Sequence, residues 1–284
     1  MVDLINDIPR DFYYREAVVE TPEILHNIKE SHIQGLYRDY LAKYRNIDKR
    51  ILEESYMFYI LDGEDELDEI IPSLYVRDLL GIQTGEFVKQ KLRFVFPIFD
   101  SFKTIIGFVG YDYEEEKYKY LISLAKFTDK NKIFFNMQNL SHAYKEDVCI
   151  VEEGVFDSLR LNENGYLNNL SLLGKRMSDY HKRVLNRFSL VIIISDNDEE
   201  GLKASKAWAE GLDTRVAHIY ITKKEIEKKI YDTETQKERI IKVKTKDIDD
   251  FLSIEENRQR FRELYNRILK DSRNTIRRLS TYSL

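Results

Sequence analysis

The sequence Leu190-Val-Ile-Ile-Ile-Ser-Asp-Asn-Asp198 is an apolar run that ends in two aspartates. A strand without polar positions has to be covered on both faces, as in a parallel sheet between two layers of helices. Further short extended runs lie on either side of it, and helix-patterned segments separate them: Val148–Val151, Asn169–Leu173 and Thr214–Ile221. This alternation of strands and helices predicts an α/β domain.

Acidic residues follow two of the predicted strands. Glu152, Glu153 and Gly154 come after the first, and Asp196 and Asp198 come after the run at 190–194. Ligands of an open parallel sheet lie beyond the carboxyl ends of its strands, so these acids would meet at one edge if the two strands are neighbours. Such a cluster suits Mg²⁺, which takes a few carboxylates and leaves positions for water and phosphate oxygens. The structural alternative is that the acids only cap the helices that follow.

Residues 1–146, before this alternation, have a different pattern. Residues 1–88 are charged and helix-patterned, and Thr21 before Pro22 predicts the start of a helix with Thr21 as its N-cap. Residues 89–146 contain the extended runs, of which the first two predict a hairpin: Arg93–Phe99, Thr104–Val109, Tyr118–Leu121 and Ile133–Phe135. Together these residues predict an α+β subdomain over 1–146.

The last part of the chain, 223–284, ends in a basic segment with a helical pattern. Eight basic residues stand against four acids between 254 and 284: Arg258, Arg260, Arg262, Arg267, Lys270, Arg273, Arg277 and Arg278. Such a tail either binds nucleic acid or a partner, or is a solvated terminal helix. The pattern leaves both interpretations open.

Composition narrows the class of protein. The chain has 45 basic and 50 acidic residues, a formal charge of −5, five scattered histidines and one cysteine, Cys149. One cysteine excludes a disulfide framework and a zinc ribbon built from this chain alone. The first residues lack the apolar core of a secretory signal, and no apolar stretch is long enough to span a membrane. We therefore expect a cytoplasmic protein with no zinc and no membrane partner.

The two acidic motifs resemble those of the Toprim domain. In that family an apolar strand ends in Glu-Gly with an Asp on the next helix, as in Glu153-Gly154 and Asp157 here, and a second strand ends in Asp-x-Asp, as in Asp196-Asn197-Asp198. Within the Toprim group the chain is most similar to DnaG-like primases of the bacterial type, over residues 34–252. The further segments that carry this resemblance are Tyr40–Ile47, Arg93–Ile98, Ile105–Gly110, Lys119–Leu121, Ser171–Lys175, Lys203–Trp208 and Lys244–Leu252.

The resemblance implies the catalytic core of a DNA primase, an enzyme that makes short RNA primers on a single-stranded DNA template from NTPs. The expected fold is a Toprim domain over 147–222, a parallel sheet flanked by helices, after an α+β basic primase subdomain over 1–146. A late Asp-x-Asp segment and a helical tail follow over 223–284.

The resemblance also assigns roles to individual residues. It places two or more Mg²⁺ or Mn²⁺ ions at Glu153, Asp196 and Asp198, with Asp247 and Asp249 holding an additional ion or shaping its surroundings. It assigns contacts with nucleotide or template to Lys91, Arg93, Lys119 and Tyr120. The alternative is that the three cations among them are ordinary surface residues. Supporting roles fall to Gly154, Asp157, Gly174 and Asn197.

Some positions depart from the family pattern. Glu152 stands where the family has an apolar residue, so the sequence leaves open which glutamate binds metal. Tyr111 and Asn136 stand where the family has an Arg and a Lys. The sequence shows no counterpart of the family's zinc module or helicase module. We therefore expect a replicative helicase as a partner, and either a separate zinc-binding or initiation protein or priming with relaxed specificity, as in a phage or mobile-element replication system.

Two other functions use the same residues. A Toprim-type metal-dependent nuclease would use the acids to activate water. A non-catalytic nucleic-acid-binding replication subunit would keep only a residual metal site. The negative net charge excludes none of these functions, because metal ions reverse the sign at the acidic cluster and local cations can attract phosphate.

Overall fold

The computed structural model describes residues 10–60, 65–82, 93–112, 120–222, 225–232, 237–274 and 279–284. The chain divides into two compact units, one of residues 1–40 and 52–133 and one of residues 41–51 and 134–284. Lys91 and Lys119, which the resemblance assigned to nucleotide or template contacts, lie outside the described residues.

The first unit is built on an antiparallel sheet in the order β1-β2-β3-β4. Its strands are β1 (Phe58–Tyr59), β2 (Phe94–Phe99), β3 (Ile105–Tyr111) and β4 (Tyr120–Leu124). The hairpin predicted around residues 93–109 is confirmed as β2 and β3, which pair from Phe94↔Tyr111 to Phe99↔Ile105. Helices α1 (Arg10–Glu30), α4 (Asp65–Ile70) and α5 (Leu74–Leu80) contribute Ile24, Ile70 and Leu80 to the core of this unit.

The predicted start of a helix at Thr21 is wrong, because α1 runs unbroken from Arg10 to Glu30 with Pro22 inside it. The Thr21 hydroxyl donates to the carbonyl of Ala17 at 2.7 Å and accepts from the backbone N–H of Ile105 at 3.1 Å. The side chain that resembled a cap therefore joins the helix to β3. Burial of Ala17, Thr21 and Ile24 on the same face stabilises the helix across the proline.

The second unit contains the expected parallel sheet, in the order β11-β8-β7-β5-β6. Its strands are β5 (Val148–Glu152), β6 (Asn169–Ser171), β7 (Leu190–Ser195), β8 (Arg215–Tyr220) and β11 (Leu279–Ser283). The predicted strand at Ile133–Phe135 is reduced to one bridge, in which Phe135 pairs with Ser171. All pairs within the sheet are parallel, as the apolar character of β7 predicted.

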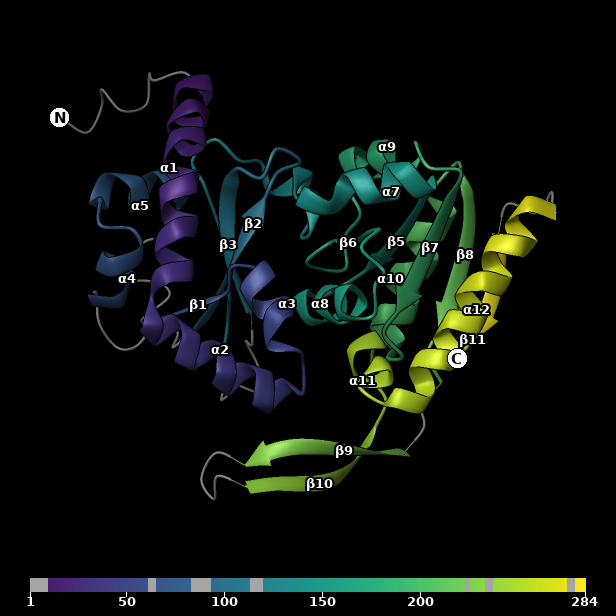
Figure 1. Ribbon diagram of the computed structural model, residues 1–284. Coiled ribbons are helices and arrows are strands. Elements are labelled where there is room, and N and C mark those ends of the chain that lie inside the picture. Colours follow the sequence, from purple (N-terminus) through teal and green to yellow (C-terminus); the bar gives the residue numbers. More distant parts are fainter. Residues whose placement is uncertain are drawn as a thin grey trace. The chain divides into compact units, whose positions relative to one another are not determined.

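Helices cover both faces of this sheet (Figure 1). On one face lie α7 (Leu140–Glu146), α9 (Asp179–Leu185) and α10 (Glu199–Glu210), and on the other α8 (Val155–Glu163), α11 (Ile248–Leu252) and α12 (Glu255–Asn274). Successive side chains of β7 point to opposite faces of the sheet. Val191 and Ile193 pack in the core on the α10 side, and Ile192 and Ile194 pack in the core on the α12 side.

The part of the chain after β8 differs from the expected helical tail. The helix α12 is present, but two strands precede it, β9 (Glu225–Asp232) and β10 (Lys237–Lys244), and β11 follows it to extend the parallel sheet. In the described part of the chain β9 and β10 pair only with each other, as an antiparallel ribbon. The remaining short elements are α2 (His32–Arg45), α3 (Lys49–Glu54), η2 (Lys130–Lys132) and η3 (Met137–Asn139).

Candidate metal centre

The fold brings two acidic motifs to one edge of the parallel sheet. Strands β5 and β7 are neighbours and pair from Val148↔Leu190 to Val151↔Ile193. Glu153 and Asp196 therefore follow the carboxyl ends of adjacent strands, as the sequence predicted. Asp198 comes two residues later, at the start of α10.

Asp198 is also a helix cap. Its carboxylate accepts a hydrogen bond of 2.6 Å from the backbone N–H of Gly201, and this bond lowers the pKa of Asp198. Gly201 in turn leaves room for Asp196, because a Cβ at position 201 would lie 2.7 Å from the Cβ of Asp196. The aspartate motif thus caps α10 and supplies carboxylates to the sheet edge at the same time, and the glycine makes that packing possible.

The carboxylates at this edge oppose one another's ionisation. Burial and the nearby charge of Glu153 raise the pKa of Asp196 to about 6. Burial likewise raises the pKa of Glu153, and the charge of Asp198 adds to the effect. A cation among these side chains would relieve the repulsion, and carboxylate oxygens are the ligands that Mg²⁺ and Mn²⁺ prefer. The donor set therefore fits a divalent cation.

Two lysines that the sequence analysis did not single out lie beside the acids. The Lys246 ammonium is 4.0 Å from the Asp196 carboxylate. Burial lowers the pKa of Lys246, but the charges of Asp196 and Asp247 raise it by more. Lys175 binds Glu200 at 2.5 Å, and this bond together with the charges of Glu153 and Asp198 raises the pKa of Lys175. Both cations are partly exposed and can meet an anionic ligand at the sheet edge.

The two adjacent glutamates lie in different environments. Glu152, the last residue of β5, is 1% exposed, and burial raises its pKa well above the usual range. Burial of this kind disfavours the charged form of a carboxyl group. Glu153 is only partly buried and feels the charges of Lys175 and Asp198. These surroundings favour Glu153 as the ligand of a cation.

Asp157 lies beneath the sheet edge, in the first turn of α8. Its two carboxyl oxygens accept from the backbone N–H groups of Gly154 and Asp249, each at 3.2 Å. Burial raises the pKa of Asp157 well above its usual range, and the charges of Asp247 and Asp196 act in the same direction. These contacts join the turn after β5 to the start of α11.

A second acidic group lies at the start of α11. Among the residues that the structure describes, Asp247, Asp249 and Asp250 have carboxyl oxygens within 4.8 Å of one another. Burial and the charges of Asp250 and Asp249 raise the pKa of Asp247 to about 7. Asp249 differs from the other two, because its oxygens bind the guanidinium groups of Arg160, at 2.8 Å, and Arg45.

Two further contacts fix the loops around the acids. Asn197, between the two aspartates, donates from its backbone N–H to the carbonyl of Lys246 at 3.0 Å and from its side chain to the carbonyl of Thr245. The indole N–H of Trp208 donates to the carbonyl of Lys175 at 3.0 Å. Lys175 follows Gly174, whose φ of +151° is one that other residues rarely adopt. The loops after β6, β7 and β10 are thus each anchored by a side chain of the same unit.

The other predicted contact residues lie in the first unit. The guanidinium group of Arg93 is 3.5 Å from the Tyr59 hydroxyl, and the Tyr120 ring is 44% exposed next to Tyr111. Asn136, which replaces a family lysine, belongs to the second unit and is buried, with its amide bound to Asn169.

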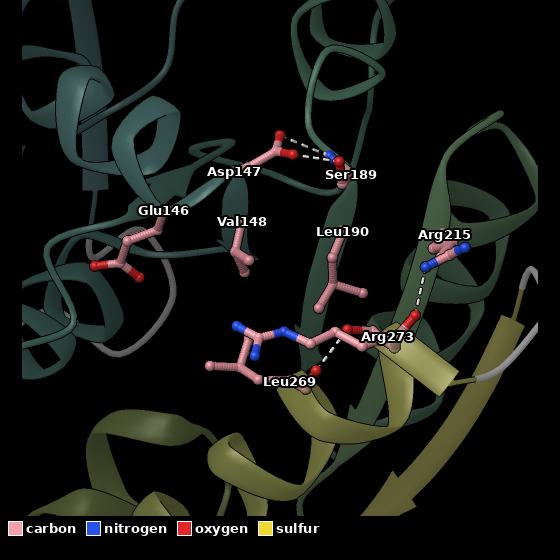
Figure 2. Close-up of a pocket in the computed structure, with 9 residues that line it drawn as sticks. Glu146, Asp147, Val148, Ser189, Leu190, Arg215, Leu269 and Arg273 are labelled. Carbon is pink, nitrogen blue, oxygen red and sulfur yellow. Dashed lines mark hydrogen bonds between the residues drawn. The ribbon is translucent and has the colours of Figure 1, made fainter.

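A charged pocket of about 450 Å³ lies at the opposite edge of the parallel sheet, where β5, β7 and β8 begin (Figure 2). Glu146, Asp147, Arg215 and Arg273 contribute its charged side chains. Asp147 accepts from the backbone N–H of Ser189 at 3.0 Å. This pocket contains none of the residues that the sequence assigned to the site, so the acidic edge is the candidate metal centre.

Residues 150–252 match the protein family described as Toprim-like. They form a Toprim domain. The match includes both acidic motifs and the late Asp247–Asp249 segment.

Solved structures extend the likeness beyond the Toprim domain. The Aquifex aeolicus primase, a structure of zinc-binding and RNA polymerase domains, superposes with a TM-score of 0.64 at 22% identity over 96% of this chain and 66% of that chain. A DnaG primase catalytic domain bound to single-stranded DNA gives 0.56 at 18% identity over 75% and 74% of the two chains. The chain therefore has the fold of the DnaG-type primase catalytic core.

Curated relatives agree with this fold. A DNA primase of Campylobacter jejuni is 34% identical over 127 residues, which cover 43% of this chain and 21% of that protein. A DNA primase of Legionella pneumophila is 29% identical over 194 residues, 64% of this chain and 32% of the relative. The chain thus spans about a fifth to a third of the length of these relatives. Of the helices that the structure describes, none has the length and apolarity needed to cross a membrane.

Proposed function

We propose that the chain is the RNA polymerase core of a DNA primase and makes short RNA primers on single-stranded DNA. The observation that carries the proposal is the position of Glu153, Asp196 and Asp198 after adjacent parallel strands of a primase-type fold. Nucleotidyl transfer needs a site that can bind the negatively charged triphosphate. The carboxylates at the sheet edge would repel it unless cations are bound among them.

In this proposal Glu153, Asp196 and Asp198 hold Mg²⁺ or Mn²⁺, and Asp247 is a further ligand. Such ions, when bound, neutralise the triphosphate and favour ionisation of the primer 3′-hydroxyl. Asp249 is held by Arg45 and Arg160, so we assign it to positioning the segment that carries Asp247. Asp157 has the same role for the turn at Gly154.

In the proposed mechanism the two lysines beside the acids bind the phosphates of the incoming nucleotide. Lys175 and Lys246 carry raised pKa values, so both are charged at neutral pH. They can bind phosphate oxygens of an incoming NTP while the acids hold the cations. Arg93 and the exposed ring of Tyr120 are proposed to contact the template, the arginine through phosphate and the tyrosine by stacking on a base.

The proposed partners follow from the relatives. One of the similar structures is a DnaG catalytic domain bound to single-stranded DNA. We therefore propose single-stranded DNA and NTPs as substrates. The resemblance of the motifs to those of DnaG-like primases supports a replicative helicase and a separate zinc-binding or initiation protein as further proposed partners.

The test is primer synthesis by the purified chain. The protein is incubated with single-stranded DNA, labelled NTPs and Mg²⁺ or Mn²⁺, and the products are resolved by length. We expect short RNA from the wild type, and at least a 100-fold lower yield from Asp196→Asn, which keeps the shape of the side chain but removes its charge. Asp179→Asn is the matched control, because Asp179 is 85% exposed at the start of α9.

Each other function would give a different result in the same assay. Cleavage of the DNA without synthesis, lost in Asp196→Asn, would show a metal-dependent nuclease. Binding of DNA without either reaction, under conditions where a purified bacterial primase is active, would show an accessory subunit. Either result would overturn the proposed function.

A further inference from the structure

The charged pocket at the opposite edge of the parallel sheet has no part in the proposed polymerase mechanism. Its volume of about 450 Å³ lies within the range of sites that take small ligands. The six residues of β7 separate it by about 20 Å from the acids that follow that strand. A ligand of this pocket would therefore occupy a site apart from the candidate metal centre.

The pocket has an apolar floor and a charged rim. Val148 and Leu190, the first residues of β5 and β7, are 8% and 4% exposed, and the partly buried Leu269 of α12 lines the pocket with them. The charged side chains lie on different sides of this floor in Figure 2: Glu146, Asp147, Arg215 and Arg273. An apolar floor suits the body of a ligand, and the charged rim selects its polar ends.

The two acids of the rim differ in what they can offer a ligand. The Tyr265 hydroxyl donates to Oε2 of Glu146 at 3.1 Å, and it accepts from the side-chain amide of Asn168 at 2.9 Å, so the Glu146 carboxylate is held in place. Both oxygens of Asp147 accept from Ser189, one from the backbone N–H at 3.0 Å and one from the hydroxyl. Within the described residues Oε1 of Glu146 has no such donor. Glu146 is therefore the acid that can accept a hydrogen bond from a ligand.

The two arginines of the rim come from different elements. Arg215, the first residue of β8, donates to the carbonyl of Ser272. Arg273, in the last turn of α12, extends across the pocket toward the side on which Glu146 lies (Figure 2). In the part of the chain that the structure describes, Arg273 forms no hydrogen bond and no ion pair. A guanidinium group on one side of an apolar floor and a carboxylate on the other suit a ligand with an anionic end and a hydrogen-bond donor at its other end.

We infer that this pocket binds a nucleotide whose base carries an amino group. The phosphate binds Arg273 and Arg215, because a guanidinium group can donate two parallel hydrogen bonds to phosphate oxygens. The base lies on the apolar floor, and its amino group donates to Glu146, as the N4 amino group of cytosine does to carboxylates. Inorganic phosphate would leave the floor and Glu146 unused. The inference goes beyond the proposed function, because this binding needs neither the metal centre nor primer synthesis.

The test uses cytidine 5′-monophosphate (CMP) and uridine 5′-monophosphate (UMP) as matched probes. The two have the same shape and differ at the edge of the ring that would face Glu146, where cytosine has an amino group and uracil a carbonyl oxygen. Binding to the full chain is measured by isothermal titration calorimetry in EDTA, which keeps metal ions away from the acidic edge. We expect CMP to bind about tenfold more tightly than UMP, because only CMP can donate from that position to the charged carboxylate.

Two variants and one control test the two ends of the ligand separately. Glu146→Gln keeps an acceptor for the Tyr265 hydroxyl and adds a donor, so it should remove the preference for CMP over UMP. Arg273→Gln should weaken the binding of both nucleotides by at least about tenfold, because it removes a cation from the phosphate. Arg260→Gln is the matched control, since Arg260 is exposed in the first half of the same helix, and it should bind like the wild type. Circular dichroism checks that all three variants are folded.

A further pair of probes decides the source of the nucleotide. Tighter binding of a dC tetranucleotide than of CMP would place the nucleotide in a single strand, and the reverse would identify a free nucleotide; both results support the site. No binding of CMP by the wild type, equal affinities for CMP and UMP, or wild-type affinity in Arg273→Gln would each overturn it. Failure of the wild type to make any RNA would overturn the proposed function and leave the binding results as they are.

Discussion

Arg160 and Asp249 form a buried ion pair across the second unit, with Nε of the arginine 2.8 Å from Oδ1 of the aspartate and side-chain exposures of 0% and 2%. The same guanidinium group donates to the carbonyls of Asn46, at 2.8 Å, and Arg45, at 3.0 Å. It also binds Glu163 at 2.6 Å. One side chain on α8 thus joins α11 and the segment at 45–46. The charge of Asp249 is compensated within the protein, which separates its role from that of Asp247.

Arg160→Met should strongly destabilise the protein. The substitution removes the Arg160 partner of the buried Asp249 carboxylate and two bonds to backbone carbonyls. We expect the free energy of unfolding to fall by about 3–5 kcal/mol, as when one partner of a buried pair is lost. Chemical denaturation followed by circular dichroism measures it. Arg50→Ala is the control, because the Arg50–Asp48 pair is exposed and should contribute less than about 1 kcal/mol. Equal effects would contradict the assigned role.

Gly201→Ala should reduce activity rather than stability. The new Cβ would meet the Cβ of Asp196 at 2.7 Å, so the aspartate has to move. A shift of about 1 Å in a positioned group can cost about 10²-fold in rate, and we expect a loss of that order in primer synthesis. Gly35→Ala in α2 is the control, because a Cβ there meets nothing within 4 Å. It should keep full activity and gain about 0.5–1 kcal/mol in stability. Wild-type activity in Gly201→Ala would show that the contact is not needed.

Removal of the Asp196 charge should stabilise the metal-free protein. The folded-state pKa of Asp196, about 6, lies above its ordinary value of 3.8, so stability falls as the pH rises between these two values and the full loss is present above about pH 6. Asp196→Asn at pH 8 in EDTA should therefore raise the free energy of unfolding by about 1–3 kcal/mol. The gain should shrink to about half at pH 5 and largely disappear only below about pH 4, where the carboxyl group is also protonated in the unfolded chain.

Mg²⁺ should reverse the order of stability between wild type and variant. A cation that binds only the folded state raises the melting temperature of the wild type, and Asp196→Asn should respond much less. Differential scanning fluorimetry over a Mg²⁺ series measures this. A wild type that is insensitive to Mg²⁺ and Mn²⁺ would argue against the metal centre.

His218 should make the protein sensitive to mild acid. It is 2% exposed on β8, and burial lowers its pKa to about 4. The unfolded chain takes up a proton near the ordinary pKa of about 6.5, whereas the folded protein does so only near 4, so stability is lost as the pH falls between these values. Between pH 7.5 and 5.5 the wild type should lose about 1 kcal/mol more than His218→Gln. The exposed His26→Gln variant should follow the wild type.

The sequence predicted the parts of the fold that depend on local patterns. The apolar run at 190–194 identified a buried strand, and the acids after it and after β5 could be placed at one sheet edge, because strand ends are visible in the sequence and parallel neighbours share an edge. The order of the strands confirmed that Glu153 and Asp196 lie together.

The features that the sequence did not predict depend on contacts between residues that are far apart in the chain. Lys246 is 50 positions from Asp196 and Arg160 is 89 positions from Asp249, and no local pattern marks either pair. The sequences of β9 and β10 are rich in charge and lack the regular alternation of apolar and polar residues that identifies a half-buried strand. Thr21 resembled a cap because its hydroxyl and the following proline are typical of helix starts, whereas contacts with β3 decide its role.

The tryptophan described at the edge of the metal centre makes the protein its own optical probe. Trp208 is the single tryptophan of the chain; it lies in α10, which Asp198 caps, and its indole N–H donates to the backbone carbonyl of Lys175. Tryptophan emission, excited selectively over that of the tyrosines, therefore comes from one known position without a label. A ligand that moves the loop at Lys175 changes the polarity and hydrogen bonding that set this emission, so occupancy of the site can be followed by spectroscopy in unmodified protein.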